Sequence, residues 1–295
     1  MPPRDVALIL LVCLAWGGNF LTSAYALREI PPFLFTALRL ALLSVVLLPF
    51  LRRPEPGQWP RLVAVCLCNG VLHFGLSFWA LRMAGNLASP AIVMQSYVPM
   101  AALLAWVVLG ERFAWRTGLA IAVSFAGVLV LGFDPLVLAA PWSLVLMLVS
   151  AFFLALGTVL MRPLRGLSAF SMQAWTAVVG VAPLLAASLL LEPGAFAAAA
   201  GAGTLAWGGV LYSAVIASLL GHGLYYLLVQ RHPIAQLTPW LLLTPVVAVG
   251  LGIAFWGDRP GIRLYVGGAM VLGGVLLIAL RAMAKARAVP PAREI

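Results

Sequence analysis

The sequence predicts an all-α membrane protein with ten transmembrane helices, arranged as a five-plus-five inverted-topology repeat. Three observations lead to this fold class. Hydrophobic residues make up 64% of the chain and charged residues only 9%, whereas soluble domains carry about 25% charged residues. Apolar runs long enough to cross a bilayer as a helix, about 20 residues each, recur along the whole chain. A block of sequence near the middle is nearly repeated close to the C-terminus.

The apolar runs define ten predicted spans, joined by hinges too short to hold a soluble domain. An unbroken run such as LLVCLAWGG does not alternate as a strand of a membrane barrel would. Backbone in hydrocarbon must satisfy its own hydrogen bonds, which leaves helices. The first run resembles a signal peptide, but its apolar core is too long, and it is kept as the first helix. The expected spans are 6–27, 32–51, 61–82, 89–110, 116–132, 142–161, 169–191, 205–229, 234–256 and 263–281.

The net charge of +10 is explained by membrane topology and needs no nucleic-acid partner. With a cytoplasmic N-terminus and ten helices, only Arg28, Arg82, Arg259 and Arg263 fall outside, Arg39 lies within a span, and the other basic residues face the cytoplasm. This distribution follows the positive-inside rule. The sequence therefore predicts a multi-pass protein of the inner (plasma) membrane, surrounded by the lipid bilayer, with both termini in the cytoplasm.

Residues 109–131 and 256–278 share one pattern, in which a glycine, an acid and an arginine separate two apolar runs. Five residue pairs keep the same spacing, half the chain length. Because five spans is an odd number, the second half enters the membrane from the opposite side, which is typical of secondary transporters. The pairs are Gly110 and Gly257, Glu111 and Asp258, Arg112 and Arg259, Arg116 and Arg263, and Gly127 and Gly274.

Three parts of the chain follow from this repeat. We expect the first five-helix repeat over 1–134, the second over 141–283, and a basic cytoplasmic tail over 284–295. The tail is expected to lie against anionic lipid headgroups.

Polar and aromatic side chains within the predicted spans indicate a substrate cavity between the halves. For any single polar residue the favoured explanation is a hydrogen bond between helices, worth on average roughly 0.6 kcal/mol in membranes. As a set they favour a cavity, because polar groups in hydrocarbon face a cavity or a partner helix. The expected cavity residues are Trp16, Asn19, Arg39, Asn69, His73, Ser77, Gln95, His222, Tyr225, Tyr226, Trp240 and Thr244. Pro99 and Pro245 are expected to act as hinges, since each removes a helix hydrogen bond.

The charged residues near the spans have two candidate roles each. Arg39 has either a structural role, in which it reaches outward or bonds backbone carbonyls, or a role in binding a substrate carboxylate. Glu111 and Asp258 lie at helix boundaries, where a carboxylate interacts favourably with the positive end of the helix dipole of the following helix. We interpret both as structural charges; a site for a coupling ion or proton is the alternative.

The paired blocks resemble the EamA-domain family of the drug/metabolite transporter superfamily. The blocks are 81–131 and 228–278, each with a helix-central proline, a Gly-acid-Arg turn and a glycine-rich last helix. LAWGGNF (14–20) and FTALRLALL (35–43) are similar to the first two helices of the family. Two departures are Asp258 in place of glutamate and Pro245, which lies one residue out of register with Pro99. The resemblance implies ten helices and export of small metabolites.

These observations favour a secondary transporter that exports aromatic and other neutral amino acids by alternating access, similar to the YddG-type exporters. An exporter of drugs, purines or other metabolites is the alternative. The histidines His73, His222 and His232 form no catalytic motif, so no enzyme and no catalytic residue is expected. Cys13, Cys66 and Cys68 lack metal-ligand spacing, and neither a metal nor a cofactor is expected. The expected partner is a small-molecule substrate, an amino acid or similar metabolite; no oligomeric state follows from the sequence.

Overall fold

The computed structural model describes residues 1–232 and 234–288, and within them every regular element is helical. Ten helical spans of this part are long and apolar enough to cross a membrane. The all-α class and the ten predicted spans are thereby confirmed. The observed spans are Pro3–Ala26, Pro32–Phe50, Trp59–Ala84, Ala88–Leu109, Trp115–Gly132, Pro141–Met161, Ala169–Leu191, Thr204–Arg231, Gln236–Trp256 and Ile262–Ala284.

Some spans are single helices and others are built from several segments. The single helices are α1 (Pro3–Ala26), α7 (Trp115–Gly132), α9 (Pro141–Met161), α10 (Ala169–Leu191) and α16 (Ile262–Ala288). The segmented spans contain α2 (Pro32–Leu47) and η1 (Leu48–Phe50); α3 (Trp59–Cys66), η2 (Leu67–His73) and α4 (Phe74–Ala84); α5 (Ala88–Met94) and α6 (Tyr97–Leu109); α12 (Thr204–Leu211), η3 (Tyr212–Gly221) and α13 (His222–Arg231); and α14 (Ile234–Leu241), α15 (Leu243–Leu251) and η4 (Gly252–Trp256). Short helices α8 (Pro135–Leu138) and α11 (Ala195–Ala200) lie in connections.

Two of the interruptions in each half fall at matching places. The third and eighth spans each contain a central π-helical segment, η2 and η3. The fourth and ninth spans each break just before a helix whose third residue is proline, Pro99 in α6 and Pro245 in α15. A proline there has no N–H for the carbonyl of the preceding helix. Pro245 lies one residue out of register with Pro99, and α15 starts one residue out of register with α6 in the same direction. The proline therefore keeps the same position relative to the break in both halves. Motion at these breaks stays a prediction.

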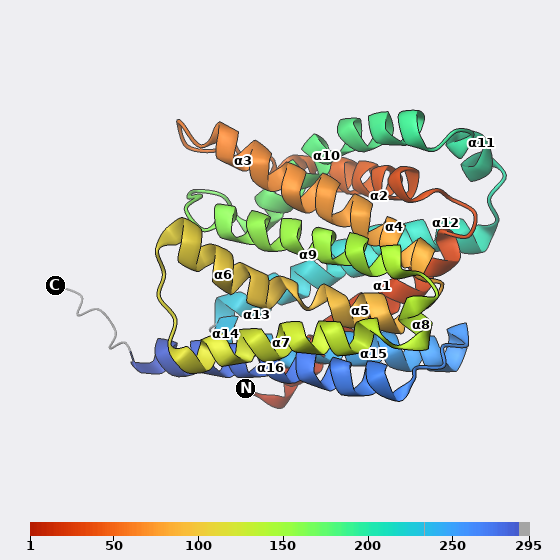
Figure 1. The fold of residues 1–295 in the computed structure, drawn as a ribbon. Helices are drawn as coiled ribbons and strands as arrows, with labels where there is room; N and C mark the ends of the chain where they lie inside the picture. The colour runs from red at the N-terminus through yellow and green to blue at the C-terminus, as the bar shows by residue number, and fades with distance from the viewer. Residues whose placement is uncertain (233, 289–295) are drawn as a thin grey trace.

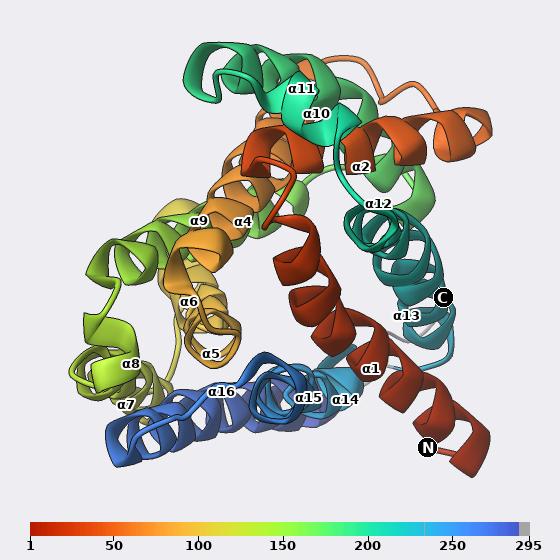
Figure 2. The same cartoon turned by 90° about the vertical axis from the view of Figure 1, so that its right-hand side faces the viewer.

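Helices α7 and α16 lie side by side along one edge of the bundle (Figures 1 and 2). Their backbones touch: a Cβ on Gly127 would lie 2.6 Å from Gly267 O, and one on Gly274 would lie 2.6 Å from Ala120 O. Ser124 Oγ donates a hydrogen bond to Val271 O, and these two residues are 147 positions apart. That separation is also the repeat spacing, so Ser124 meets its own repeat equivalent.

The bundle has two distinct ends (Figure 1). The N-terminus and the C-terminal part of α16 lie at one, called here the termini end; α8 and α11 lie at the other, called the far end. Seen from the far end, α1 runs between the α2–α10 layer and the layer of α7, α15 and α16 (Figure 2). Of the predicted tail, residues 284–288 continue α16, and 289–295 lie outside the described residues.

The close α7–α16 contact predicts different effects for two neighbouring glycines. A Cβ on Gly274 would collide with Ser124 Oγ and Ala120 O, whereas one on Gly273 would meet nothing within 4 Å. We expect Gly274→Ala to lower the free energy of unfolding by about 1–3 kcal/mol, because overpacking forces backbones apart. Gly273→Ala is the matched control and should leave stability unchanged or slightly raised. Thermal unfolding in detergent measures both, and equal shifts would contradict the contact.

Candidate functional site

Arg39 on α2 is the one arginine that the structure buries within its described part, with 3% of its surface exposed. Its Nε and Nη2 donate to Ser218 Oγ at 3.1 and 2.8 Å. The guanidinium carbon lies 4.0 Å from the centre of the Phe74 ring and 5.6 Å from that of Phe78. Nη1 is buried and has no hydrogen-bond partner. The side chain therefore does not extend to the surface, which was one form of the structural role considered from the sequence.

Ser218, the polar partner of Arg39, lies in the π-helical segment η3. Ser218 Oγ donates to Ser213 O, five residues back, at 2.7 Å. One residue earlier, Ala217 O accepts a hydrogen bond from Trp16 Nε1 at 2.9 Å. Gly221 makes room for this indole, since a Cβ there would lie 2.6 Å from Trp16 Nε1. Single π-helical turns inside helices are frequent at functional sites.

Aromatic side chains from α1 and α13 lie next to these polar contacts. The Trp16 ring lies 5.1 Å from the His222 ring and 5.7 Å from the Tyr225 ring. His222 is exposed, and its Nδ1 lies 3.1 Å from the carbonyl oxygen of Ser218, whose hydroxyl binds Arg39. We define the central cluster as Trp16, Arg39, Phe74, Phe78, Ser218, His222 and Tyr225. It takes residues from both halves of the chain.

Two predicted cavity residues in η2 instead pack against α9. His73 Nδ1 lies 2.9 Å from Ser150 Oγ, which in turn donates to His73 O at 2.8 Å. Asn69 lies directly on Gly157, where a Cβ would collide with its side-chain amide. His73 thus fits the alternative considered from the sequence, a hydrogen bond between helices.

The remaining predicted residues lie around the cluster. Ser77 Oγ bonds Phe74 O within its own helix, Asn19 Oδ1 accepts from Ser23 Oγ, and Tyr226 packs on Phe170. Trp240 packs near Tyr225 in the hydrophobic group around Ile9 and Val12, and the backbone of Thr244 faces Gly17. Gln95 lies at the break between α5 and α6. Whether these residues line one substrate cavity stays a prediction.

Phe74 and Phe78 were missed from the sequence. Phe74 directly follows His73, and Phe78 lies one helical turn after Phe74, which is the only signal that the sequence offers. A phenylalanine in a span is equally compatible with lipid, so that signal is weak.

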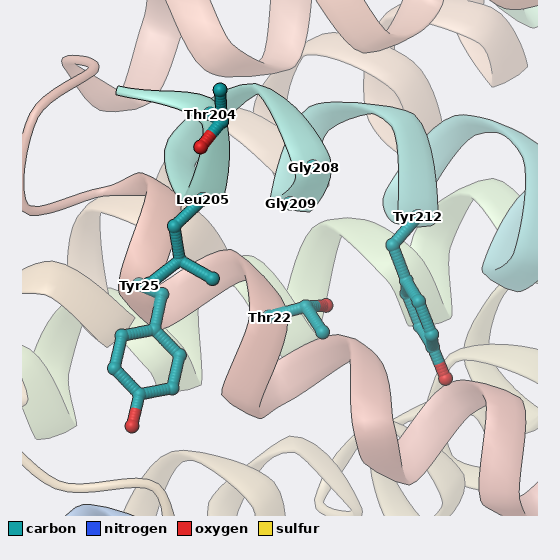
Figure 3. A pocket seen from close by; sticks show the side chains of 7 residues that line it. All are labelled: Thr22, Tyr25, Thr204, Leu205, Gly208, Gly209 and Tyr212. Carbon is teal, nitrogen blue, oxygen red and sulfur yellow. The ribbon is translucent and has the colours of Figure 1, made fainter. Parts of the chain in front are cut away.

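A groove of about 350 Å³ lies between α1 and α12 toward the far end (Figure 3). None of the predicted cavity residues lines it. Its lining is neutral, so it offers no counter-charge to Arg39. Its residues are Thr22, Tyr25, Thr204, Leu205, Gly208, Gly209 and Tyr212.

Carboxylates at the far end bind the first backbone N–H groups of helices in the opposite half. Such N–H groups have no partner within their own helix. Asp258 Oδ2 accepts from Leu87 N and Ala88 N at 2.9 and 3.0 Å, at the start of α5. The Glu192 carboxylate accepts from Phe33 N and Leu34 N at 2.8 and 3.1 Å, at the start of α2.

Two further acids complete this set. Asp134 Oδ2 accepts from Leu264 N at 3.0 Å at the start of α16, and Glu29 Oε2 accepts from Gly203 N at 2.7 Å just before α12. We call Glu29, Asp134, Glu192 and Asp258 the carboxylate clamps. Burial raises the pKa of the Asp258 carboxyl above its ordinary value, while the hydrogen bonds from Leu87 and Ala88 act in the opposite direction.

Glu111 and Asp258, the two predicted structural charges, do not interact with the helices that follow them as expected. Asp258 was expected to favour the helix that follows it, α16, but the first turn of α16 is already bound by Asp134. Glu111 forms an ion pair with Arg162 of the other half at 2.7 Å, with 53% of its side chain exposed. These repeat-equivalent acids therefore occupy opposite environments, since Asp258 is 5% exposed.

At the termini end, Asp5 also joins the two halves. Its carboxylate lies 3.1 Å from Arg231 Nη1 and 2.7 Å from His232 Nε2. Within the described residues, no group of three or more His, Cys, Asp and Glu side chains is arranged to hold a metal ion.

Comparison with known proteins gives consistent matches. The EamA-like transporter family matches residues 4–133 and 141–280. A "Probable amino-acid metabolite efflux pump" of Salmonella typhimurium (strain LT2) is 30% identical over 94% of this chain and 95% of its own. The protein of the same name from Escherichia coli (strain K12) is 26% identical over the same shares.

Two further matches cover less of the chain or share a lower identity. A "Probable terminal-alkyne amino-acid exporter" of Streptantibioticus cattleyicolor is 29% identical over 80% of this chain and 78% of its own. One solved crystal structure superposes with a TM-score of 0.64 at 19% identity, covering 99% of this chain and 100% of that one. At this identity the superposition supports the fold alone.

The contact between Arg39 and Ser218 predicts a specific loss of stability. Ser218→Ala removes the acceptor of two guanidinium N–H groups, and unmet hydrogen bonds to a buried charge cost about 1.5–3 kcal/mol. Ser188 is equally buried, and its hydroxyl has no partner. Ser188→Ala is therefore the matched control and should change stability little. Thermal unfolding in detergent measures both variants. An equal loss in the two would show that Ser218 contributes only by packing.

Proposed function

The chain belongs to the EamA-like transporter family and is a multi-pass membrane transporter, not an enzyme, and from this premise we propose what it carries and how. It exports amino acids, chiefly aromatic and other neutral ones, across the inner membrane. Transport follows alternating access between two inverted five-helix repeats, with both termini in the cytoplasm.

The observation that carries this proposal is the composition of the central cluster. It combines four aromatic rings, a neutral hydroxyl, an imidazole and one cation, contributed by α1, α2, α4, η3 and α13. Aromatic rings suit an apolar or aromatic side chain. A single cation suits one carboxylate better than a sugar phosphate, which requires several basic groups. The names of the related efflux pumps point to the same substrate class.

The inverted repeat is supported by the contacts between α7 and α16. A two-fold axis makes each contact occur twice with the partners exchanged, and lets a residue meet its own equivalent. Gly127 against Gly267 and Gly274 against Ala120 are exchanged in this way at the repeat spacing, and Ser124 bonds its equivalent Val271. The family also matches each half separately.

Alternating access is supported by the different environments of equivalent acids at the two ends. At the far end four carboxylate clamps join the halves, and we infer that this end is the closed one. At the termini end the equivalent of Asp258 is Glu111, which is exposed and held only by Arg162. Under the inverted repeat the opposite state exchanges these environments. In our proposal the structure is the state closed to the outside.

Substrate flux tests the proposed activity. We expect proteoliposomes containing the purified protein to move radiolabelled phenylalanine and tryptophan saturably, with flux accelerated by unlabelled amino acid on the opposite side. Flux that does not saturate would indicate a channel. If no amino acid moves but a purine or a drug-like cation does, the substrate class is wrong and the metabolite or drug exporter replaces it.

Opening of the far end tests the proposed mechanism. Asp258→Asn removes the charge that binds Leu87 N and Ala88 N, and we expect the far end to open about five-fold more often. Leu87→Cys, at a buried position and in a background without Cys13, Cys66 and Cys68, reports opening through labelling by an impermeant maleimide added outside cells. Glu111→Gln is the matched control, because exposed ion pairs contribute little. Unchanged labelling in Asp258→Asn would contradict the gate.

A further inference from the structure

The interior of the bundle contains a positive charge without a counter-charge. Arg39 lies within the second span and is almost completely buried. The ion pairs of the described residues involve Arg162, Arg231 and His232, not Arg39. The other titratable groups that its charge affects are His73 and His222, and neither can carry negative charge. Burying an unpaired charge is costly.

The neutral partners of Arg39 compensate only part of this cost. The single hydrogen of Ser218 Oγ is committed to Ser213 O, so the hydroxyl offers lone pairs to Nε and Nη2 and carries no charge. The faces of Phe74 and Phe78 lie near the guanidinium, and a desolvated cation–π contact is worth about 2 kcal/mol. Nη1 still has no partner at all.

We propose that the guanidinium of Arg39 binds the α-carboxylate of the transported amino acid. This inference rests on the proposed function and names the group of the substrate that the protein recognises. A carboxylate supplies one negative charge and two acceptors to a planar fork of donors, of which Nη1 is unused. The rings of Trp16 and Tyr225 lie 5.7 Å apart, and Trp16 bonds Ala217 O, next to Ser218. They then offer apolar surface to the substrate side chain.

Because other side chains cover Arg39, recognition of a substrate carboxylate requires a conformational change in the site. Only 3% of the Arg39 surface is exposed, and the Phe74 and Phe78 rings lie against its guanidinium. A carboxylate therefore reaches the guanidinium only when the side chains around it move. A ligand without a carboxylate would leave the charge uncompensated after the same movement. Sites built to pair a buried polar group reject analogues that lack the partner far more strongly than apolar pockets reject a missing methylene. We therefore expect Arg39 to discriminate between ligands with and without a carboxylate, and to accept amino acids with different side chains.

The test compares three ligands on the wild-type protein. Uptake of radiolabelled phenylalanine into proteoliposomes is competed with phenylethylamine, which lacks the carboxylate, and with hydrocinnamate, which lacks the amine. We expect hydrocinnamate to compete, and phenylethylamine to require at least about thirty-fold higher concentration than unlabelled phenylalanine. Equal competition by phenylethylamine would overturn the proposal. This comparison requires no variant to fold.

The variant Arg39→Lys assigns the discrimination to its residue. Lysine keeps the charge but loses the planar fork, and we expect the half-saturating concentration of phenylalanine to rise about ten-fold or more and the discrimination against phenylethylamine to shrink. Arg263→Lys, at an exposed arginine that bonds Phe133 O, is the matched control and should behave as wild type. Size-exclusion chromatography checks that both variants are folded.

The outcomes separate this inference from the proposed function. If phenylalanine is transported but folded Arg39→Lys keeps the wild-type discrimination, another group binds the carboxylate and the inference is wrong. If no amino acid is transported by the wild-type protein, the proposed function fails and the inference fails with it.

Discussion

The fold depends on one constraint of helices: the first N–H groups of each helix have no partner within it and require acceptors from elsewhere. At the far end the chain meets this constraint with carboxylates from the opposite half, so that α2, α5, α12 and α16 each begin on an acid that is distant in sequence. The same bonds satisfy helix ends and hold the two halves together. A chain with only eight acids thus uses most of them at the joint between its halves.

The centre of the bundle shows the complementary arrangement, a charge with too few partners. Within the π-helical segment η3, Ser218 Oγ accepts from Arg39 of α2, and Ala217 O accepts from Trp16 of α1. The segment therefore joins α1, α2 and the second half through polar contacts in an otherwise apolar bundle.

Hydropathy was sufficient to predict the ten spans, because crossing a bilayer imposes both length and composition. Local chemistry also identified Pro99 and Pro245, which stand directly after the observed breaks. The site was harder. Trp16, Arg39, His222 and Tyr225 were among the predicted residues and do come together, but His73 and Asn69 face α9. Nothing in sequence spacing distinguishes the two sides of a span when both are apolar. The clamps join residues far apart in the chain, and only the tertiary structure pairs them.

The seam between α7 and α16 has a consequence for how such a bundle evolves. In the proposed alternating-access mechanism, the contact of Ser124 with its repeat equivalent Val271 lies on the two-fold axis, so it is expected to be kept in both states. Damage at that seam should reduce the amount of folded protein while leaving the balance between inward- and outward-facing forms untouched. Substitutions at the far end should change this balance and leave the amount of folded protein unchanged. Natural selection can therefore adjust the abundance of the protein and its conformational balance separately.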